Sequence, residues 1–383
     1  MNTGIYIHIP FCRSRCSYCD FNTYIDQSHL QDRYVRALID EIRACQPAAF
    51  STLFFGGGTP SLLTPNQIGG VIRACRDHLG LIENAEVTME CNPGTTNLAY
   101  LDGIRASGVN RLSFGAQTAN ANELRLLHRE HEWGDVARAV RDSRAAGFDN
   151  LNLDLIFGLP YQSLESWRET LEATLALEPE HLSLYALIIE QGTPMHDWTR
   201  RGEVPFPDPD LAADMYELAE KMLSLERPER SQRSGRLYEH YEISNWCKPG
   251  RECQHNLIYW RNEPYLGLGA GAHGSAITHR EWRARKPAEY VQRAERGEST
   301  IAGSEEIDPR TSMGETMMVG LRLLQEGVTH ARFAARHGAA MQDVFGAELA
   351  ESERKGLLVV NDERAVLTER GRFLSNQVFK LFV

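Results

Sequence analysis

The sequence predicts an α/β protein built on a parallel sheet. Short apolar runs recur along the first half of the chain, and amphipathic stretches of ten or more residues separate them. This alternation is typical of βαβ units, in which consecutive strands lie parallel and helices cover the sheet. Six such units precede about residue 187, so the pattern indicates either a parallel barrel or a doubly wound sheet.

The predicted strands are nearly continuous apolar runs, as expected for strands that are buried on both faces. They cover residues 4–9, 52–55, 86–91, 111–115, 151–157 and 181–187. The predicted helices between them cover residues 32–44, 65–78, 98–107, 133–146 and 164–177. Gly80, Gly108 and Gly147 follow three of these helices and fit the left-handed cap position that glycine tolerates best.

The pattern changes after about residue 200. A helix is predicted over 210–225, a polar solvated loop over 226–236 and a strand over 237–243. From about residue 308 the chain is mostly helical, and two apolar segments near 356–367 predict a short hairpin, which together resemble a winged-helix module. Acidic residues are interspersed among the arginines there and leave no strong basic face, so packing or partner binding is favoured over DNA recognition.

Composition and charge narrow the class of protein. The chain has 383 residues, of which 42% are hydrophobic and 24% charged, as in an ordinary soluble globular protein. A formal net charge of −11 argues against general affinity for nucleic acid. No run reaches the ~20 apolar residues that span a bilayer, and no signal peptide is recognisable. Eight cysteines without a secretion signal favour the reducing cytoplasm, and a homo-oligomer is left open.

Three cysteines are the most informative feature of the chain. Cys12, Cys16 and Cys19 lie within eight residues, directly after the first predicted strand. This spacing lets one short loop hold three irons of a 4Fe–4S cluster and leaves the fourth iron without a protein ligand, open to a small molecule. A zinc site is the alternative, but it requires a fourth ligand, and His8 is a poor candidate because it lies on the strand.

Further motifs follow the later strands: residues 6–12 (YIHIPFC), 56–60 (GGGTP), 89–94 (MECNPG) and 115–117 (GAQ). In this order they resemble the radical S-adenosylmethionine (SAM) superfamily. The subgroup is that of the oxygen-independent coproporphyrinogen III oxidases and their relatives, the HemW-type heme chaperones. The resemblance implies a partial (β/α)6 TIM-like barrel with a smaller C-terminal helical, winged-helix-like domain. The expected domains are a radical SAM core barrel at 1–235, a flanking segment at 236–300 and the C-terminal domain at 301–383.

The resemblance also implies a SAM site at the carboxyl ends of the strands, where active sites of such barrels lie. Carboxylates suit the ribose hydroxyls or the α-ammonium of SAM, and an arginine suits its α-carboxylate. Each of these residues alone would more often be half of a surface ion pair. The family's SAM contacts map onto Tyr6, Gly57, Gly58, Thr59, Glu90, Gln117, Arg129 and Asp154.

Two features separate the subgroup's chaperones from its oxidases. The oxidase signature has a fourth cysteine where this chain has Phe21, which puts oxidase activity in doubt and leaves open whether the protein is an enzyme. Residues 255–260 match the HNxxYW signature of the HemW-type chaperones. Imidazole can ligate heme iron and aromatic rings can stack on a porphyrin. From the residues alone, a buried structural histidine is the simpler interpretation. The match instead predicts heme binding by His255, Asn256, Tyr259 and Trp260.

The leading hypothesis is therefore a chaperone that binds heme, a 4Fe–4S cluster and SAM. It would deliver heme to apo-proteins, for which the family suggests respiratory and membrane-associated enzymes. A radical SAM oxidase of a tetrapyrrole is the competing hypothesis. A winged-helix regulator whose cluster senses oxygen or iron is the third. A basic, aromatic segment at 279–286 could pair with heme propionates, but a solvated face is the favoured explanation.

Overall fold

The computed structural model of the protein describes residues 3–224 and 238–383. Its main body is a 12-stranded sheet with the order β12-β11-β10-β9-β1-β2-β3-β4-β5-β6-β8-β7. The six central strands pair in parallel, each with the next one along the chain. Their bounds are Gly4–Ile9 (β1), Phe50–Gly57 (β2), Leu81–Cys91 (β3), Arg111–Gln117 (β4), Leu151–Phe157 (β5) and His181–Ala186 (β6). All six predicted strands are confirmed.

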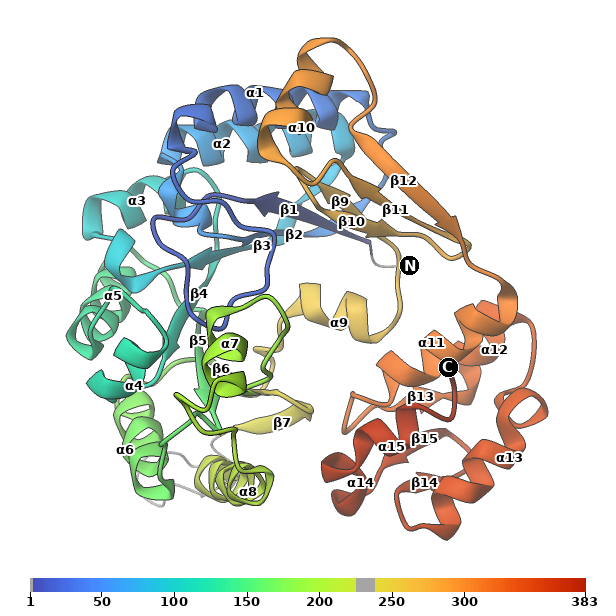
Figure 1. The fold of residues 1–383 in the computed structure, drawn as a ribbon. Helices are drawn as coiled ribbons and strands as arrows, with labels where there is room; N and C mark the ends of the chain where they lie inside the picture. The colour runs from blue at the N-terminus through green and yellow to red at the C-terminus, as the bar shows by residue number, and fades with distance from the viewer. Residues whose placement is uncertain (1–2, 225–237) are drawn as a thin grey trace.

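Helices cover the outer face of this curved sheet (Figure 1). The predicted ones are α1 (Gln31–Ala44), α2 (Pro65–Ala74), α3 (Leu98–Ala106), α5 (Trp133–Ala145), α6 (Leu164–Leu175) and α8 (Pro209–Ser224), and the short α4 (Ala121–Leu126) and α7 (Pro194–Arg200) are added in loops. Helix α2 is shorter than predicted because a wide helical turn, Cys75–Leu79, continues it. Gly80, Gly108 and Gly147 have φ of 84°, 109° and 87°, which confirms the left-handed conformation predicted for them.

Short strands extend the sheet at both edges. Beside β1 lie β9 (Tyr265–Leu268), which is parallel to it, and the antiparallel β10 (His273–Ser275), β11 (His279–Arg283) and β12 (Ile301–Glu306). Helix α10 (Pro287–Glu295) packs on α1. Beside β6 lie β8 (Asn245–Cys247) and β7 (Glu239–Glu242), the second of which confirms part of the predicted strand at 237–243. The predicted polar loop at 226–236 lies outside the described residues.

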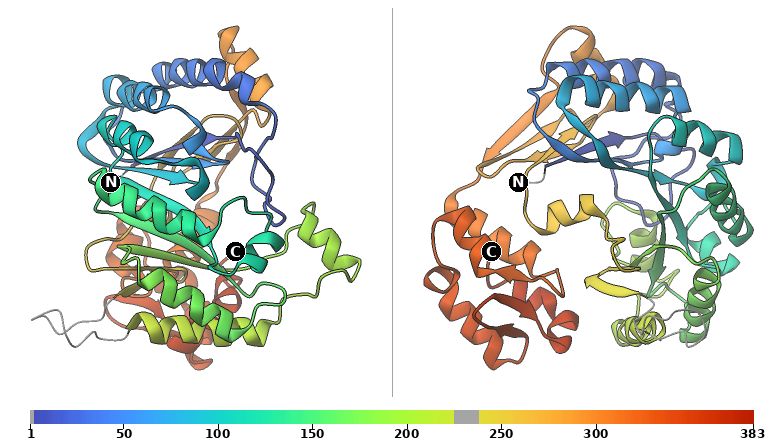
Figure 2. Two further views of the ribbon diagram at one scale, coloured as in Figure 1. Left: turned by 90° about the vertical axis from the view of Figure 1, so that its left-hand side faces the viewer. Right: turned by 180° about the vertical axis from the view of Figure 1, so that it is seen from behind.

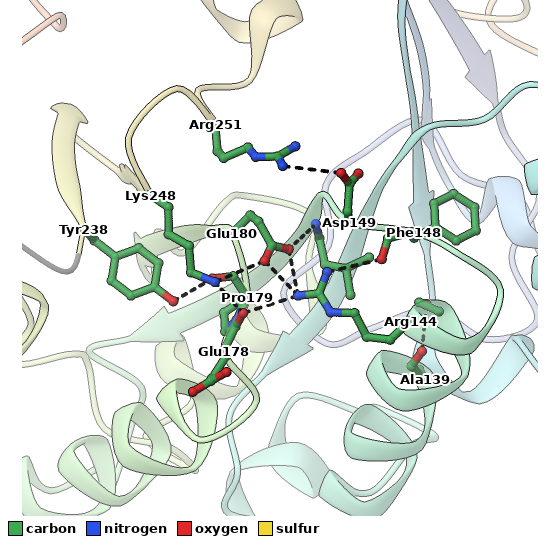
Figure 3. Close-up of polar contacts among 12 residues, drawn as sticks. Ala139, Arg144, Phe148, Asp149, Glu178, Pro179, Glu180, Tyr238, Lys248 and Arg251 are labelled. Atoms are coloured by element: carbon green, nitrogen blue, oxygen red, sulfur yellow. Dashed lines mark hydrogen bonds and ion pairs between the residues drawn. The ribbon is translucent and has the colours of Figure 1, made fainter. Parts of the chain in front are cut away.

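A polar network fixes the segment that follows β8 to the barrel (Figure 3). Glu180 accepts contacts from Arg144 at 2.7 Å and from Lys248 at 3.1 Å, and its carboxylate also accepts the backbone N–H of Leu151 at 3.1 Å. Glu180 is only 9% exposed, so its charge is compensated by two cations in a partly desolvated place. These contacts join α5, the start of β5 and the end of β8.

The C-terminal part of the chain has its own hydrophobic core, which includes Met317, Phe333 and Phe345. A sheet of order β13-β15-β14 lies against helices, which confirms a small helical domain with the predicted hairpin. Among the described residues, no helix is both long and apolar enough to cross a membrane. The elements are α11 (Pro309–Gly320), β13 (Val328–Thr329), α12 (His330–His337), α13 (Met341–Arg354), β14 (Leu358–Val360), β15 (Arg364–Leu367), α14 (Glu369–Phe373) and α15 (Ser375–Phe379).

The large sheet curves without closing, and the C-terminal domain lies across its open side (Figures 1 and 2). Helix α9 (Gln254–Trp260) lies inside the curve, between the sheet and that domain. Ion pairs join the two parts: Arg261 with Glu326 at 2.7 Å, Arg322 with Glu242 at 3.1 Å and Arg372 with Glu220 at 2.5 Å. The open side of the partial barrel is thus filled by one helix and covered by the second domain.

Candidate functional site

A cavity of about 440 Å³ opens at the carboxyl ends of the parallel strands. Parallel strands bring the residues at their carboxyl ends to one edge of the sheet, which is why motifs far apart in the sequence meet here. Of the residues predicted for the cluster and for SAM, only Tyr6 does not line this cavity. Those that line it are Cys12, Cys16, Cys19, Gly57, Gly58, Thr59, Glu90, Gln117, Arg129 and Asp154.

Hydrogen bonds to backbone carbonyls hold the cysteine loop at its start and near its middle. The N–H of Cys12 donates to the carbonyl of Tyr24 at 3.0 Å, and the hydroxyl of Ser17 donates to the carbonyl of Leu126 at 2.7 Å. Burial raises the pKa of the Cys12 thiol and raises that of Cys19 to about 11. These two thiols therefore keep their protons at neutral pH until a metal binds and releases them. Three thiols on one fixed loop that faces a cavity are a donor set that fits an iron–sulfur cluster.

Arg129 lies beside this loop. Its Nη1 is 3.5 Å from the sulfur of Cys16, and its Nη2 donates to the carbonyl of Gly115 at 2.8 Å. Burial disfavours its charge, but Tyr18 and Cys16 outweigh burial and raise the pKa of Arg129. Its buried Nε has no hydrogen-bond partner among the described residues. A fixed guanidinium with an unused donor is suited to an anionic group in the cavity.

Two carboxylates face the cavity from β3 and β5. Burial and the nearby Asp154 raise the pKa of Glu90 to about 8, although the N–H of Gly57 donates to Glu90 at 3.2 Å. Burial also raises the pKa of Asp154, against the opposing effect of hydrogen bonds from Ser113 and Asn152. A cationic ligand would stabilise both carboxylates in the charged form. The pair is therefore suited to an ammonium, a sulfonium or ribose hydroxyls.

The glycine run at the end of β2 is required by close packing. Gly57 has φ of 113°, and a Cβ there would lie 2.6 Å from the ring of His8. A Cβ on Gly58 would lie 2.7 Å from the carbonyl oxygen of Phe11. This backbone therefore passes directly behind the cysteine loop, where the polar groups of residues 57–59 can approach a ligand closely. Thr59 adds a side-chain contact, because its hydroxyl lies 3.5 Å from the sulfur of Cys12.

Tyr6 does not line the cavity. Its hydroxyl is hydrogen-bonded to Nδ1 of His8 at 3.0 Å, and its ring stacks on Phe54. Burial and the charge of Glu90 raise its pKa. The predicted contact of Tyr6 with SAM stays a prediction.

Several lining residues were not predicted, among them Tyr18, Ser113, His128 and Tyr185. Strand parity could have found Ser113, because it lies on the predicted fourth strand two positions before Gly115.

The HNxxYW motif forms helix α9 and lies apart from the cavity. His255 is fully buried, with Nδ1 2.7 Å from the hydroxyl of Thr52 and Nε2 2.8 Å from that of Tyr259. Its ring stacks on Phe54, and burial, together with the charge of Arg111, lowers its pKa to about 3. Both ring nitrogens are therefore occupied. A heme iron can reach one of them only after Thr52 or Tyr259 moves away.

Trp260, the last residue of the motif, faces the C-terminal domain. The guanidinium of Arg322 lies over the ring of Trp260, 4.4 Å from its centre. The next residue, Arg261, pairs with Glu326. Glu86 of β3 accepts backbone N–H groups from Gln254 and His255 at the start of the helix. The basic segment is also internally paired: Arg283 is 3% exposed and bonds to Glu41, and Arg280 pairs with Glu315.

Comparison with known proteins agrees with this geometry. Residues 6–174 match the radical SAM superfamily, and residues 307–374 match the HemN C-terminal domain. The heme chaperone HemW of Mycobacterium tuberculosis is 37% identical over 384 residues, which cover 98% of this chain and 94% of the relative. The heme chaperone HemW of Bacillus subtilis is 35% identical over 385 residues, which cover 99% and 98%. The chain therefore belongs to the HemW family of the radical SAM superfamily.

A solved structure supports the fold. The coproporphyrinogen III oxidase HemN of Escherichia coli, a radical SAM enzyme, superposes with a TM-score of 0.82 at 23% identity. The match covers 100% of this chain and 90% of HemN. The partial barrel and the small C-terminal domain are thus a shared architecture, and at this identity the likeness concerns the fold alone.

Proposed function

We propose that this protein is a heme chaperone, which binds heme and delivers it to apo-proteins. The observation that supports this most is the similarity to HemW over nearly the whole chain, including the HNxxYW segment on α9. Respiratory and membrane-associated hemoproteins are the proposed recipients. The eight cysteines are free thiols, which fits action in a reducing compartment such as the cytoplasm.

The cavity is the proposed site of a 4Fe–4S cluster with bound SAM. Cys12, Cys16 and Cys19 would hold three irons and leave one for the amino and carboxylate groups of SAM. Such a pair of cofactors supplies one-electron reduction of the SAM sulfonium. The chain's own contribution is to orient the ligand and to shield it from water.

Each wall of the cavity has a proposed role in holding SAM. Arg129 binds the α-carboxylate through its unused donor. Glu90 and Asp154 bind the ribose hydroxyls or the N–H groups of the α-amine, and the backbone of residues 57–59 lies along the ligand. Gln117, which has φ of 67° at a bulge in β4, and Tyr6 complete the proposed set.

The proposed heme site is the HNxxYW motif, with His255 as axial ligand and Asn256, Tyr259 and Trp260 around the macrocycle. Both nitrogens of His255 are hydrogen-bonded, one to Thr52 and the other to Tyr259. Heme binding there therefore requires that one of these two hydrogen bonds breaks. Cys253 is the next candidate ligand; its buried sulfur is 3.6 Å from Glu86.

The test is an anaerobic comparison of wild type and His255→Ala, each with verified iron content. Heme should bind the wild type and pass to an apo-acceptor, and the variant should show a changed Soret band and faster loss of heme. Cluster content should stay the same, because the two sites use different ligands. Identical spectra and affinities would make His255 a purely structural residue.

The second candidate function is that of a radical SAM oxidase acting on a tetrapyrrole, which the match of residues 307–374 to the HemN C-terminal domain favours. Phe21 argues against it, because it stands where the oxidase signature has a fourth cysteine and is 65% exposed at the cavity rim. With SAM and a reductant, the protein should leave coproporphyrinogen III unconverted. Formation of protoporphyrinogen would establish the oxidase instead.

A further inference from the structure

Neighbouring side chains orient the carboxylate of Asp154. The hydroxyl of Ser113 donates to Oδ2 at 2.9 Å, and the amide nitrogen of Asn152 donates to Oδ1 at 2.8 Å. The same amide nitrogen donates to the oxygen of Ser113 at 2.7 Å. An ionised carboxylate only accepts hydrogen bonds, so the side chain of Asn152 must present its NH2 group to Asp154. Its carbonyl oxygen therefore points the other way.

That carbonyl oxygen meets His181 of β6. Nδ1 of His181 lies 2.6 Å from Oδ1 of Asn152, and the hydroxyl of Ser183 donates to the same oxygen at 3.2 Å. An amide oxygen only accepts, so His181 must carry its proton on Nδ1. Its Nε2 is then an acceptor, and the hydroxyl of Tyr241 lies 2.9 Å from it as the donor. One tautomer and one amide orientation satisfy every contact.

These hydrogen bonds form a path from Asp154 at the cavity through Asn152 and His181 to Tyr241. Asn152, His181 and Tyr241 are 2%, 0% and 5% exposed, and none of them lines the cavity. Burial and the charge of Arg111 hold the pKa of His181 well below its usual value, so the ring is neutral. Tyr241 belongs to β7, and its backbone carbonyl accepts the N–H of Leu324 of the C-terminal domain at 2.9 Å.

We propose that His181 and Tyr241 are positioning residues for SAM, acting through Asn152 on the carboxylate of Asp154. This rests on the proposed function, in which Asp154 contacts SAM. Without the N–H of His181, the oxygen of the Asn152 amide keeps the longer hydrogen bond from Ser183, at 3.2 Å, but loses the shorter one. The amide is then less firmly held and can turn its oxygen toward Asp154, where two acceptors repel each other. The carboxylate then leaves the orientation that meets the ligand.

A matched pair of variants tests the donor. In His181→Asn an amide N–H can take the place of Nδ1–H, whereas His181→Leu has no donor. By titration calorimetry of anaerobic, cluster-loaded protein, SAM affinity should fall about tenfold in His181→Leu and less than about threefold in His181→Asn. Tyr241→Phe should cause a loss between these two, because it removes the donor that keeps the proton of His181 on Nδ1. All three must match the wild type in iron content and thermal stability. Equal losses in the leucine and asparagine variants would overturn the proposal.

A double-mutant cycle separates positioning from general damage. If His181 acts through Asp154, then His181→Leu should cause no further loss of SAM affinity in an Asp154→Asn protein. The same tenfold loss in both backgrounds would overturn this inference and leave the SAM site intact. Unchanged affinity in Asp154→Asn alone would instead remove Asp154 from the proposed SAM site, and the inference with it.

A spectroscopic readout does not depend on cofactor loading. In protein with 15N-labelled histidine, the side-chain nitrogen signals of His181 should be those of the Nδ1–H tautomer across neutral pH. Asn152→Ala, which removes the acceptor, should shift His181 toward a mixture of tautomers. An Nε2–H tautomer in the wild type would overturn the proposed path.

Discussion

The cavity at the strand ends and the HNxxYW helix differ in how well their polar groups are satisfied. In the cavity, three thiols, a guanidinium Nε and two carboxylates with raised pKa surround an opening of about 440 Å³. On α9, His255 is fully buried, and both of its nitrogens have partners. The first region is prepared for a ligand, whereas the second is stable as it stands. Binding at the helix therefore includes the breaking of contacts that binding at the cavity does not require.

The largest effect on the difference between the two regions is expected from removal of a cluster ligand. Cys16→Ser should abolish stable iron and sulfide loading on anaerobic reconstitution, because each of the three loop cysteines would supply one iron ligand, whereas Cys91, which also lines the cavity, is buried at the end of β3. Cys45→Ser, at the end of α1 and outside the cavity, should load like the wild type. Full loading of Cys16→Ser would show that the cluster does not bind in this cavity.

The second-largest effect concerns Arg129, whose Nε has no hydrogen-bond partner among the described residues. Arg129→Ala should weaken SAM binding by roughly 1.5–3 kcal/mol, since it removes a charge-assisted contact. Arg125→Ala is a matched control, because Arg125 is exposed on α4 and, within the described part of the chain, bonds only to Ala121 and Asn122. Calorimetry on protein with verified cluster content measures both. Equal affinities of the two variants would show that Arg129 does not meet the ligand.

The two regions should also respond to pH with opposite sign. The folded pKa of Glu90, about 8, lies above the ordinary value of 4.5, so the folded protein keeps a proton that the unfolded chain has released. Its effect is to lower the free energy of unfolding as pH rises from about 4.5 to 8, by at most about 1.4 kcal/mol per pH unit. His255, with a pKa lowered to about 3, instead lowers stability as pH falls below about 6.5.

Urea unfolding of metal-free protein between pH 5 and 9 measures this balance. Glu90→Gln should show a flatter decline above pH 6.5 than the wild type, because glutamine has no proton to lose. A decline of the same slope in both proteins would mean that the charge of Glu90 is compensated in the empty cavity.

The smallest expected effect is on the rate of heme loading at α9. Thr52→Val removes one of the two hydrogen bonds that occupy His255, so heme should load faster, by about threefold to tenfold if opening limits the rate. Thr52→Ser keeps the hydroxyl and should behave like the wild type. Stopped-flow measurement of the Soret band decides between them. Equal rates in all three proteins would mean that heme binds without displacing Thr52.

The sequence was a good guide where one local pattern determined the structure. Residues 4–9 and 151–157 are strands with the predicted bounds because their apolar runs are buried on both faces. Their convergence at one cavity followed from parallel topology, which places all carboxyl ends together. The partial barrel could be predicted for these reasons.

Other features depended on distant partners and could not be read from the chain. Strand β11 reads HREWR, a charged segment, yet Arg283 is buried there because Glu41, 242 positions earlier, compensates it. Likewise, nothing near residue 255 indicates that Thr52 and Phe54 enclose its ring. The roles of the cavity and motif residues in binding cofactors stay predictions, to be decided by the variants above.

The place of α9 inside the curve of the sheet has a consequence for biosynthesis. His255 packs against a strand that leaves the ribosome 203 residues earlier. At ~5–20 residues per second, that strand waits roughly 10–40 seconds for its partner. During this interval the inner face of β2, with Thr52 and Phe54, has no α9 to cover it. A nascent chain stalled before residue 250 should therefore be more sensitive to protease and more dependent on cellular folding factors than one stalled after the C-terminal domain.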